Sequence, residues 1–143
     1  MKAKLHGVFG LVALLCIVTF WLSTVVAELL LDQASVVFVK NMVVAGMWVL
    51  IPAMAATGGS GFSLARSRRG RLVEAKQRRM KMVAVNGLLV LLPSALLLAR
   101  WASAGRLDAG FYALQGLELV AGATNITLLA LNLRDGRRLA GRR

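Results

Sequence analysis

The sequence predicts an all-α membrane protein, a bundle of four transmembrane helices that run alternately up and down. The chain is 58% hydrophobic with a mean hydropathy of +0.70, whereas a soluble domain is about 45–50% apolar. The apolar residues form four long runs instead of alternating with polar residues, which is typical of segments that cross a bilayer. The runs cover about 5–30, 34–56, 82–102 and 110–133, and they leave a basic segment 57–81 and a basic tail 134–143. We expect one integral membrane domain over residues 1–143.

The distribution of positive charge predicts the orientation of these helices. Eighteen Lys and Arg oppose six Asp and Glu, which gives a formal charge of +12. Most of the basic residues lie at the N-terminus, in the 57–81 segment and in the tail, whereas the two short connections are nearly balanced. Because Lys and Arg are enriched in cytoplasmic loops, both termini and the basic loop are expected in the cytoplasm. No aromatic stacking set accompanies the charge, so nucleic acid is not an expected partner.

The first run, 5–30, has a competing interpretation as a signal peptide. Val25 and Ala27 would fit a small-residue cleavage site, but the apolar region of a signal peptide spans only about 7–15 residues. We therefore expect a retained transmembrane helix. Cys16 lies inside this run and is the only cysteine, so the chain cannot form an intrachain disulfide.

The second run, 34–56, contains a lysine within the apolar segment. Lys40 lies six residues inside the run, or about 9 Å along a helix. From that depth its ammonium could extend to the interface, or it could pair with a polar group on another helix. The sequence leaves both interpretations open.

The basic segment, 57–81, is expected to be a cytoplasmic loop. Its start, TGGSGF, has the composition of a flexible turn, whereas residues 72–82 contain good helix formers and are expected to extend the third helix. The turn lacks the Gly-Lys-Ser/Thr ending of a nucleotide-binding loop. Anionic lipid headgroups are the simpler partner for the nearby arginines, which are Arg66, Arg68, Arg69, Arg71, Arg78 and Arg79.

The third run, 82–102, contains a proline among apolar residues. Asn86, Pro93 and Arg100 are spaced at intervals of seven, which places them near one face of a helix. Pro93 removes one backbone donor, so a kink is expected, which transmembrane helices tolerate when neighbours satisfy the freed carbonyl.

The fourth run, 110–133, carries a row of polar and small residues. Gln115 is followed at offsets of three, seven, ten and seventeen by Glu118, Gly122, Asn125 and Asn132, a spacing that places them on one helix face. Seventeen residues of helix span about 25 Å, close to the ~30 Å hydrocarbon thickness of a bilayer. A central acid facing lipid would cost on the order of 3 kcal/mol. The row must therefore face other helices.

Equal depth in the bilayer pairs these residues with partners on other helices. Lys40 and Glu118 lie about 9–12 Å inside one membrane face, and Asn86 and Asn125 both lie in the half nearer the cytoplasm. The sequence therefore predicts two contacts, Lys40 with Glu118 and Asn86 with Asn125. Such contacts fit a seam that fixes helix register, and they also fit a polar pathway for a proton, ion or small solute.

Metal and cofactor chemistry has few candidate ligands. His6 is the sole histidine, which excludes a bis-histidine haem within one chain. His6 with Met54, Met80 or Met82 could ligate haem or copper, although these residue types in an apolar chain more often pack. We predict no cofactor and no metal site. No Ser/His/Asp, Cys/His or paired-carboxylate set lies at matching depth, so we also predict no catalytic residues.

Several segments resemble those of short four-span proteins of the bacterial inner membrane. They are KAKLHG, FWLSTVVAELL, GGSGF, KQRRM and ELVAGATNITLLALNLRDGRRL. The resemblance covers nearly the whole chain and implies a multi-pass inner-membrane protein, but no activity. Small multidrug transporters are similar in size and number of spans, but their acid lies within the first span, whereas Glu28 is near its end.

The expected function is that of a non-enzymatic structural, assembly or interaction subunit. It would contact anionic lipid through its basic loop and associate with itself or with a larger membrane complex. A small transporter or channel component with a polar path through Lys40, Asn86, Glu118 and Asn125 is the alternative. A membrane redox module that binds haem or copper is the third possibility.

Overall fold

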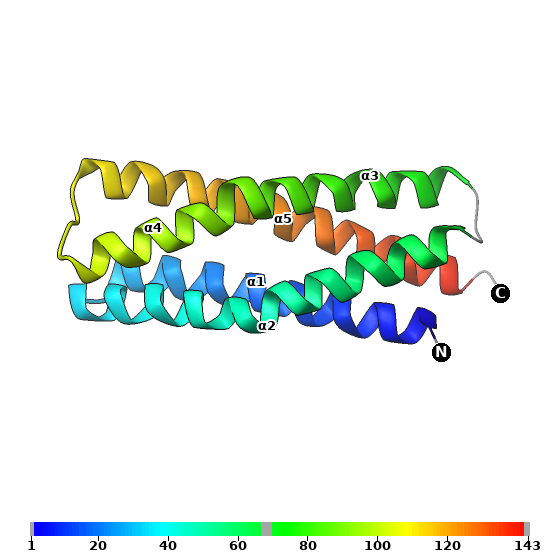
Figure 1. Cartoon of the computed structure of the whole chain (residues 1–143), viewed down its shortest axis with the longest axis horizontal. Helices are drawn as coiled ribbons and strands as arrows, with labels where there is room; N and C mark the ends of the chain where they lie inside the picture. Colours follow the sequence, from blue (N-terminus) through cyan, green and yellow to red (C-terminus); the bar gives the residue numbers. More distant parts are fainter. Residues whose placement is uncertain (1, 67–69, 142–143) are drawn as a thin grey trace.

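The chain folds into long helices. In the computed structural model, which describes residues 2–66 and 70–141, the elements are α1 (Lys2–Leu30), α2 (Gln33–Arg66), α3 (Arg71–Asn86), the π-helix η1 (Gly87–Leu91), α4 (Leu92–Ser103) and α5 (Ala109–Ala140). α3, η1 and α4 follow one another without a break and form a single rod, here called the third rod (Figure 1). With α1, α2 and α5, this rod makes four helices long and apolar enough to cross a membrane. The expected all-α fold with four candidate spans is confirmed.

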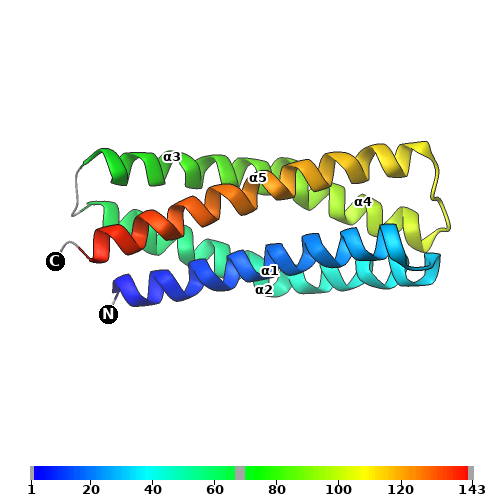
Figure 2. The same cartoon turned by 180° about the vertical axis from the view of Figure 1, so that it is seen from behind.

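The four rods form a ring in which each rod contacts two neighbours. α1 packs against α2 and α5, and the third rod also packs against α2 and α5. Within the described chain, α2 and α5 make no close backbone contact with each other, and neither do α1 and the third rod. These two pairs therefore lie on the diagonals of the bundle. Figures 1 and 2 show the successive rods running in opposite directions.

The two ends of the bundle carry different charges. One end of the bundle, here called the terminal end, holds the first residues of α1 and α3 and the last residues of α2 and α5 (Figures 1 and 2). The opposite end, the connection end, holds the short α1–α2 and α4–α5 connections. Exposed basic side chains of the described residues gather at the terminal end: Lys4, Arg66, Arg71, Arg78, Lys81, Arg134, Arg137 and Arg138. At the connection end, the basic residues Arg100 and Arg106 are accompanied by the acids Asp32 and Asp108.

An aspartate precedes each of the two helices that begin at the connection end. Asp32 accepts a hydrogen bond from the backbone N–H of Ser35 at 3.0 Å, and Asp108 accepts one from the backbone N–H of Phe111 at 3.0 Å. Each carboxylate thus satisfies a donor that the first turn of a helix leaves unpaired. Hydrogen bonds from Ser35 lower the pKa of Asp32, and the Arg106 guanidinium lowers the pKa of Asp108. Both acids are therefore ionised at neutral pH.

The glycine-rich turn expected at the start of the 57–81 segment is helical instead, so that prediction is wrong. α2 continues to Arg66. In this part of the described chain, the residue with a positive φ is Gly70, at 135°. Thr57 and Ser60 donate their hydroxyl protons to backbone carbonyls four residues earlier, which lets both polar side chains stay within a helix. The helical stem expected at 72–82 is present within α3.

Close packing explains the glycine at position 61. A Cβ at Gly61 would lie 3.0 Å from the imidazole of His6 on α1. Glycine costs about 1 kcal/mol relative to alanine inside a helix, and the contact between α1 and α2 offsets that cost. Glycine composition alone does not distinguish this use from a turn.

The structure accommodates Pro93 with a widened helical turn. The N–H of Leu92 donates to the carbonyl of Gly87, five residues earlier, which is the π-helical pattern. Pro93 has no N–H, and its ring would collide with the carbonyl four residues before it in a regular α-helix. The wider turn of η1 moves that carbonyl aside, so α3 and α4 continue as one rod.

Two apolar clusters fill the bundle. Near the connection end, the buried residues are Ala27, Val36, Leu98, Ala102 and Phe111. Toward the terminal end, the buried residues are Ile17, Val83 and Leu129, and two methionines, Met54 and Met80, pack against them.

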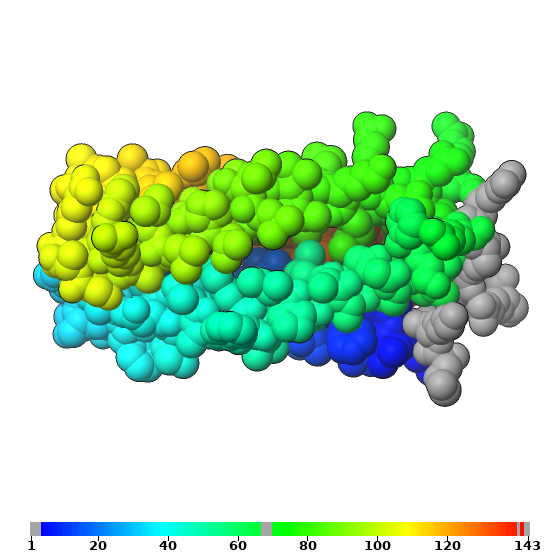
Figure 3. Space-filling model, viewed as in Figure 1, coloured from blue at the N-terminus to red at the C-terminus, as the bar shows by residue number. Residues whose placement is uncertain are grey.

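The outer surface of the bundle is apolar as well. Trp48 of α2 is 85% exposed and Leu89 of η1 is 71% exposed. Figure 3 shows the face to which α2 and the third rod contribute most of the side chains. Apolar side chains on the outside are expected of helices that face lipid.

Candidate functional site

The polar row on α5 faces the interior of the bundle, as the spacing predicts. Gln115, Asn125 and Asn132 are buried, and the Glu118 side chain is 13% exposed. Asp135, three residues beyond Asn132, extends the row and is 1% exposed. These residues contact partners at three levels, here called the lysine layer, the asparagine layer and the aspartate layer.

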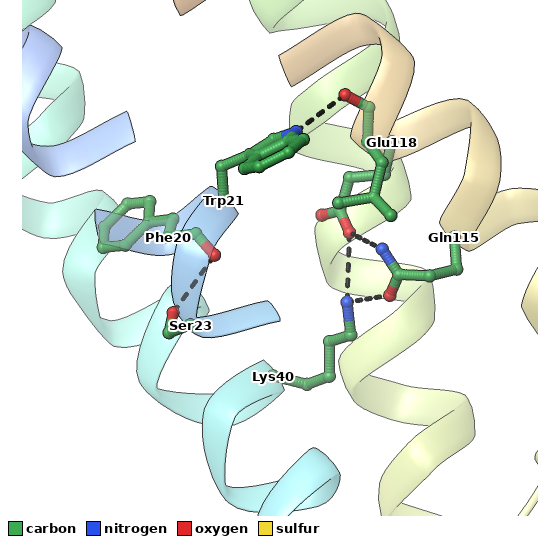
Figure 4. Close-up of polar contacts among 7 residues, drawn as sticks. Phe20, Trp21, Ser23, Lys40, Gln115 and Glu118 are labelled. Carbon is green, nitrogen blue, oxygen red and sulfur yellow. Dashed lines mark hydrogen bonds and ion pairs between the residues drawn. The ribbon is translucent and has the colours of Figure 1, made fainter. Parts of the chain in front are cut away.

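The lysine layer consists of Lys40, Gln115 and Glu118. The Lys40 ammonium donates to Glu118 Oε2 at 3.1 Å and also to Gln115 Oε1. The Gln115 side-chain amide donates to the same Glu118 oxygen at 2.9 Å, which closes a triangle (Figure 4). The predicted contact between Lys40 and Glu118 is confirmed.

Lys40 crosses the axis of the bundle to make these bonds. It belongs to α2 and its partners belong to α5, the diagonal neighbour of α2. The Lys40 side chain is only 2% exposed, so its ammonium does not extend to the interface. A lysine in this position connects two helices whose backbones do not touch.

The asparagine layer joins α3 to α5. Asn86 donates to the Asn125 side-chain oxygen at 2.8 Å and to the backbone carbonyl of Ala121 at 2.9 Å. Asn125 in turn donates to the backbone carbonyl of Val83 at 3.3 Å. The predicted contact between Asn86 and Asn125 is therefore confirmed. Asn86 is the last residue of α3, so this contact lies directly beside the widened turn of η1.

The sequence did not predict the aspartate layer. Arg79 and Asp135 form an ion pair at 2.6 Å, with the Asp135 side chain 2% exposed. Asn132 lies within 3.5 Å of the same guanidinium and donates to the backbone carbonyl of Lys76 at 3.4 Å. Asp135 falls outside the apolar run, so hydropathy assigns it to the tail. Its offset of three from Asn132 is the signal that could have placed it in the polar row.

The arginines proposed to bind lipid phosphate differ in their surroundings. Arg66, Arg71 and Arg78 are exposed at the terminal end, whereas Arg79 is committed to Asp135. Arg68 and Arg69 lie outside the described residues. The exposed arginines therefore remain the candidates for contact with headgroups.

Two glycines allow aromatic residues of α1 to approach its neighbours. A Cβ at Gly46 of α2 would collide with the Phe20 ring, and a Cβ at Gly122 of α5 would lie 3.0 Å from the Trp21 ring. The Trp21 indole N–H donates to the backbone carbonyl of Leu119 at 2.9 Å (Figure 4). Small residues at these contacts let helices approach closely, which is the usual basis of helix association in membranes.

His6 makes a hydrogen-bonded contact within the protein. Its Nδ1 lies 3.0 Å from the Ser60 hydroxyl of α2. Met54 and Met80 belong to the apolar cluster toward the terminal end instead, and Met82 is 51% exposed. The haem or copper hypothesis thus gains no geometric support from these methionines.

Comparisons with known proteins add no function. Across residues 2–66 and 70–141, no three His, Cys, Asp or Glu residues group in a way that could hold a metal ion. The chain matches no protein-family model, no curated protein and no solved structure. Its function is therefore inferred from the geometry of the three polar layers and from the charge of the two ends.

Proposed function

We propose that the protein is a non-enzymatic structural, assembly or interaction subunit of the bacterial inner membrane. The observation that supports this role is that each polar layer joins two helices through contacts between side chains of the chain. Interhelical hydrogen bonds in a membrane fix which residues of neighbouring helices lie side by side. A bundle fixed in this way has a defined outer shape, which suits association with a second copy or with a larger membrane complex.

Buried apolar side chains interrupt the row of polar groups at two levels. Phe111 and Leu98 are fully buried between the lysine layer and the connection end. Val83 and Leu129 are buried between the asparagine and aspartate layers. On α3, Val83 lies between Arg79 and Asn86, and on α5, Leu129 lies between Asn125 and Asn132. A pathway for ions or solutes would need polar groups or space at these levels. This arrangement favours a packing seam over the transporter alternative.

The basic terminal end supports contact with anionic lipid. Exposed arginines and lysines on all four rods lie at this end, where headgroups of a bilayer surround the helices, and each basic residue near such a surface contributes about 1 kcal/mol of attraction. Lys81 also borders a shallow groove on α3 and η1, whose other lining residues are Met82, Val85, Asn86, Leu89 and Val90. A lipid phosphate would pair with the Lys81 ammonium, and an acyl chain of the same lipid would cover the apolar lining of the groove.

Glu118→Gln distinguishes a subunit from a transporter. In a subunit, this change weakens the contact with Lys40, so the yield of folded protein and the recovery of co-purifying partners in mild detergent should fall. Proteoliposomes of the wild-type protein should show no more solute or ion flux than empty liposomes. Glu74→Gln, at an exposed acid of α3, is the matched control and should leave yield unchanged. Flux in the wild type that disappears with Glu118→Gln would overturn the proposal.

A further inference from the structure

Glu28 of α1 feels the charges of Lys40 and Glu118 but takes no part in the hydrogen bonds of the lysine layer. Its Oε1 is shielded by the protein and accepts no hydrogen bond from a described residue. A shielded carboxylate oxygen without a donor is unfavourable, because its lost hydrogen bonds to water are not replaced. The comparable oxygen of Asp135 has the Arg134 guanidinium at 3.5 Å, whereas none of the ion pairs found among the described residues includes Glu28.

The charges around Glu28 do not balance. The helices that pack against α1 are α2 and α5, and the charged groups that act on Glu28 from them are Lys40 and Glu118. Lys40 already donates to Gln115 and Glu118. With both acids ionised, this part of the bundle would hold two negative charges and one positive charge. An uncompensated charge that the protein partly shields from water is unfavourable.

Glu28 also lies near the connection end of the bundle. It lies two residues before the end of α1 at Leu30, which is about 3 Å along the helix axis. Its side chain is half-buried, and the exposed connection residues Leu31 and Asp32 follow soon after. A small cation from the water at the connection end can therefore reach Glu28 without passing through the bundle.

We propose that Glu28 and the lysine layer together form a binding site for one small monovalent cation. A proton from the water at the connection end would bond to the Glu28 carboxylate and convert it to a carboxylic acid. A sodium ion would instead bind the Glu28 carboxylate, and the negative charge of Glu118 would add to its attraction. Either ligand removes the excess negative charge and gives the shielded oxygen of Glu28 a positive partner. This site is compatible with a subunit role, because neutralisation stabilises the bundle without requiring flux.

Thermal unfolding of the full chain in lipid nanodiscs tests the site and identifies its ligand. In sodium-free choline buffer, a proton site predicts that the wild-type melting temperature is several degrees lower at about pH 8.5 than at about pH 6, where the folded state binds one more proton. A sodium site predicts that added sodium chloride, but not choline chloride, raises the melting temperature at the higher pH. Glu28→Gln is uncharged and similar in shape to the protonated acid, so it should lose both dependences.

Two controls make the result decisive. Glu74→Gln, which removes an exposed acid far from the lysine layer, should retain the wild-type dependence. If Glu28→Gln fails to fold, infrared spectra of the wild type in bilayers replace it, because a protonated carboxyl group has its own C=O band. Titration of that band, or its response to sodium, supports the site. A melting temperature and spectrum that respond to neither cation, or a response that persists in Glu28→Gln, would overturn the proposal.

Discussion

At the scale of single residues, the bond from Lys40 to Glu118 has the largest expected energetic weight. Both groups are removed from water, and breaking a buried pair by deleting one partner typically costs about 3–5 kcal/mol, because the other charge is left uncompensated. By contrast, the exposed pair of Arg106 and Asp108, at 2.7 Å, lies in water. Pairs of that kind contribute little to stability, because water screens their charges.

Lys40→Met should therefore destabilise the bundle by about 3–5 kcal/mol. The double variant Lys40→Met with Glu118→Leu should recover much of that loss, because neither position then carries a charge. Reversible unfolding in mixed micelles measures both free energies of unfolding. Arg106→Met is the matched control and should cost much less than Lys40→Met, because water screens the charges of the exposed pair. Equal losses for Lys40→Met and Arg106→Met would contradict the structure.

At the scale of helices, the sequence predicted contacts more reliably than boundaries. Helical rise converts position in the chain into depth, so the sequence alone suffices to pair Lys40 with Glu118 and Asn86 with Asn125. The end of α2 could not be predicted, because glycine fits both a turn and a close helix contact, and only the position of His6 shows which applies. The widened turn at η1 likewise depends on how the third rod packs around its proline.

Gly46 gives an element-scale prediction about the contact between α1 and α2. Gly46→Ala places a Cβ against the Phe20 ring, so the helices must separate or Phe20 must leave its position, a change that typically costs about 1–3 kcal/mol. Gly59 of the same helix has open space around it, and Gly59→Ala should be neutral or stabilising by about 0.5–1 kcal/mol. Unfolding measurements on both variants check the difference. The opposite order of stabilities would show that α1 and α2 pack differently.

At the scale of the whole molecule, the charge of the two ends should also select lipid. The terminal end has an excess of exposed basic residues, whereas the connection end carries two exposed acids beside its two bases. The triple change Arg71→Gln, Arg78→Gln and Lys81→Gln should reduce the amount of anionic phospholipid retained on purification, measured by native mass spectrometry. The same change at Arg100 and Arg106 is the control and should have little effect. Unchanged lipid retention in the triple variant would remove the lipid-binding part of the proposed function.

The same asymmetry predicts which end faces the cytoplasm. Basic residues that flank transmembrane helices tend to stay on the cytoplasmic side. The terminal end should therefore be cytoplasmic, and the connection end should face the opposite compartment. In a Cys16→Ala background, Ala104→Cys places a thiol at the connection end and Ser63→Cys places one at the terminal end, both at exposed positions. A membrane-impermeant maleimide on intact bacterial cells should label position 104 and should label position 63 only after permeabilisation. The reverse pattern would invert the topology, and labelling of both positions in intact cells would mean that the chain inserts in two orientations. Neither result would disturb the three polar layers, since their contacts depend on helix packing and not on the direction in which the bundle crosses the membrane.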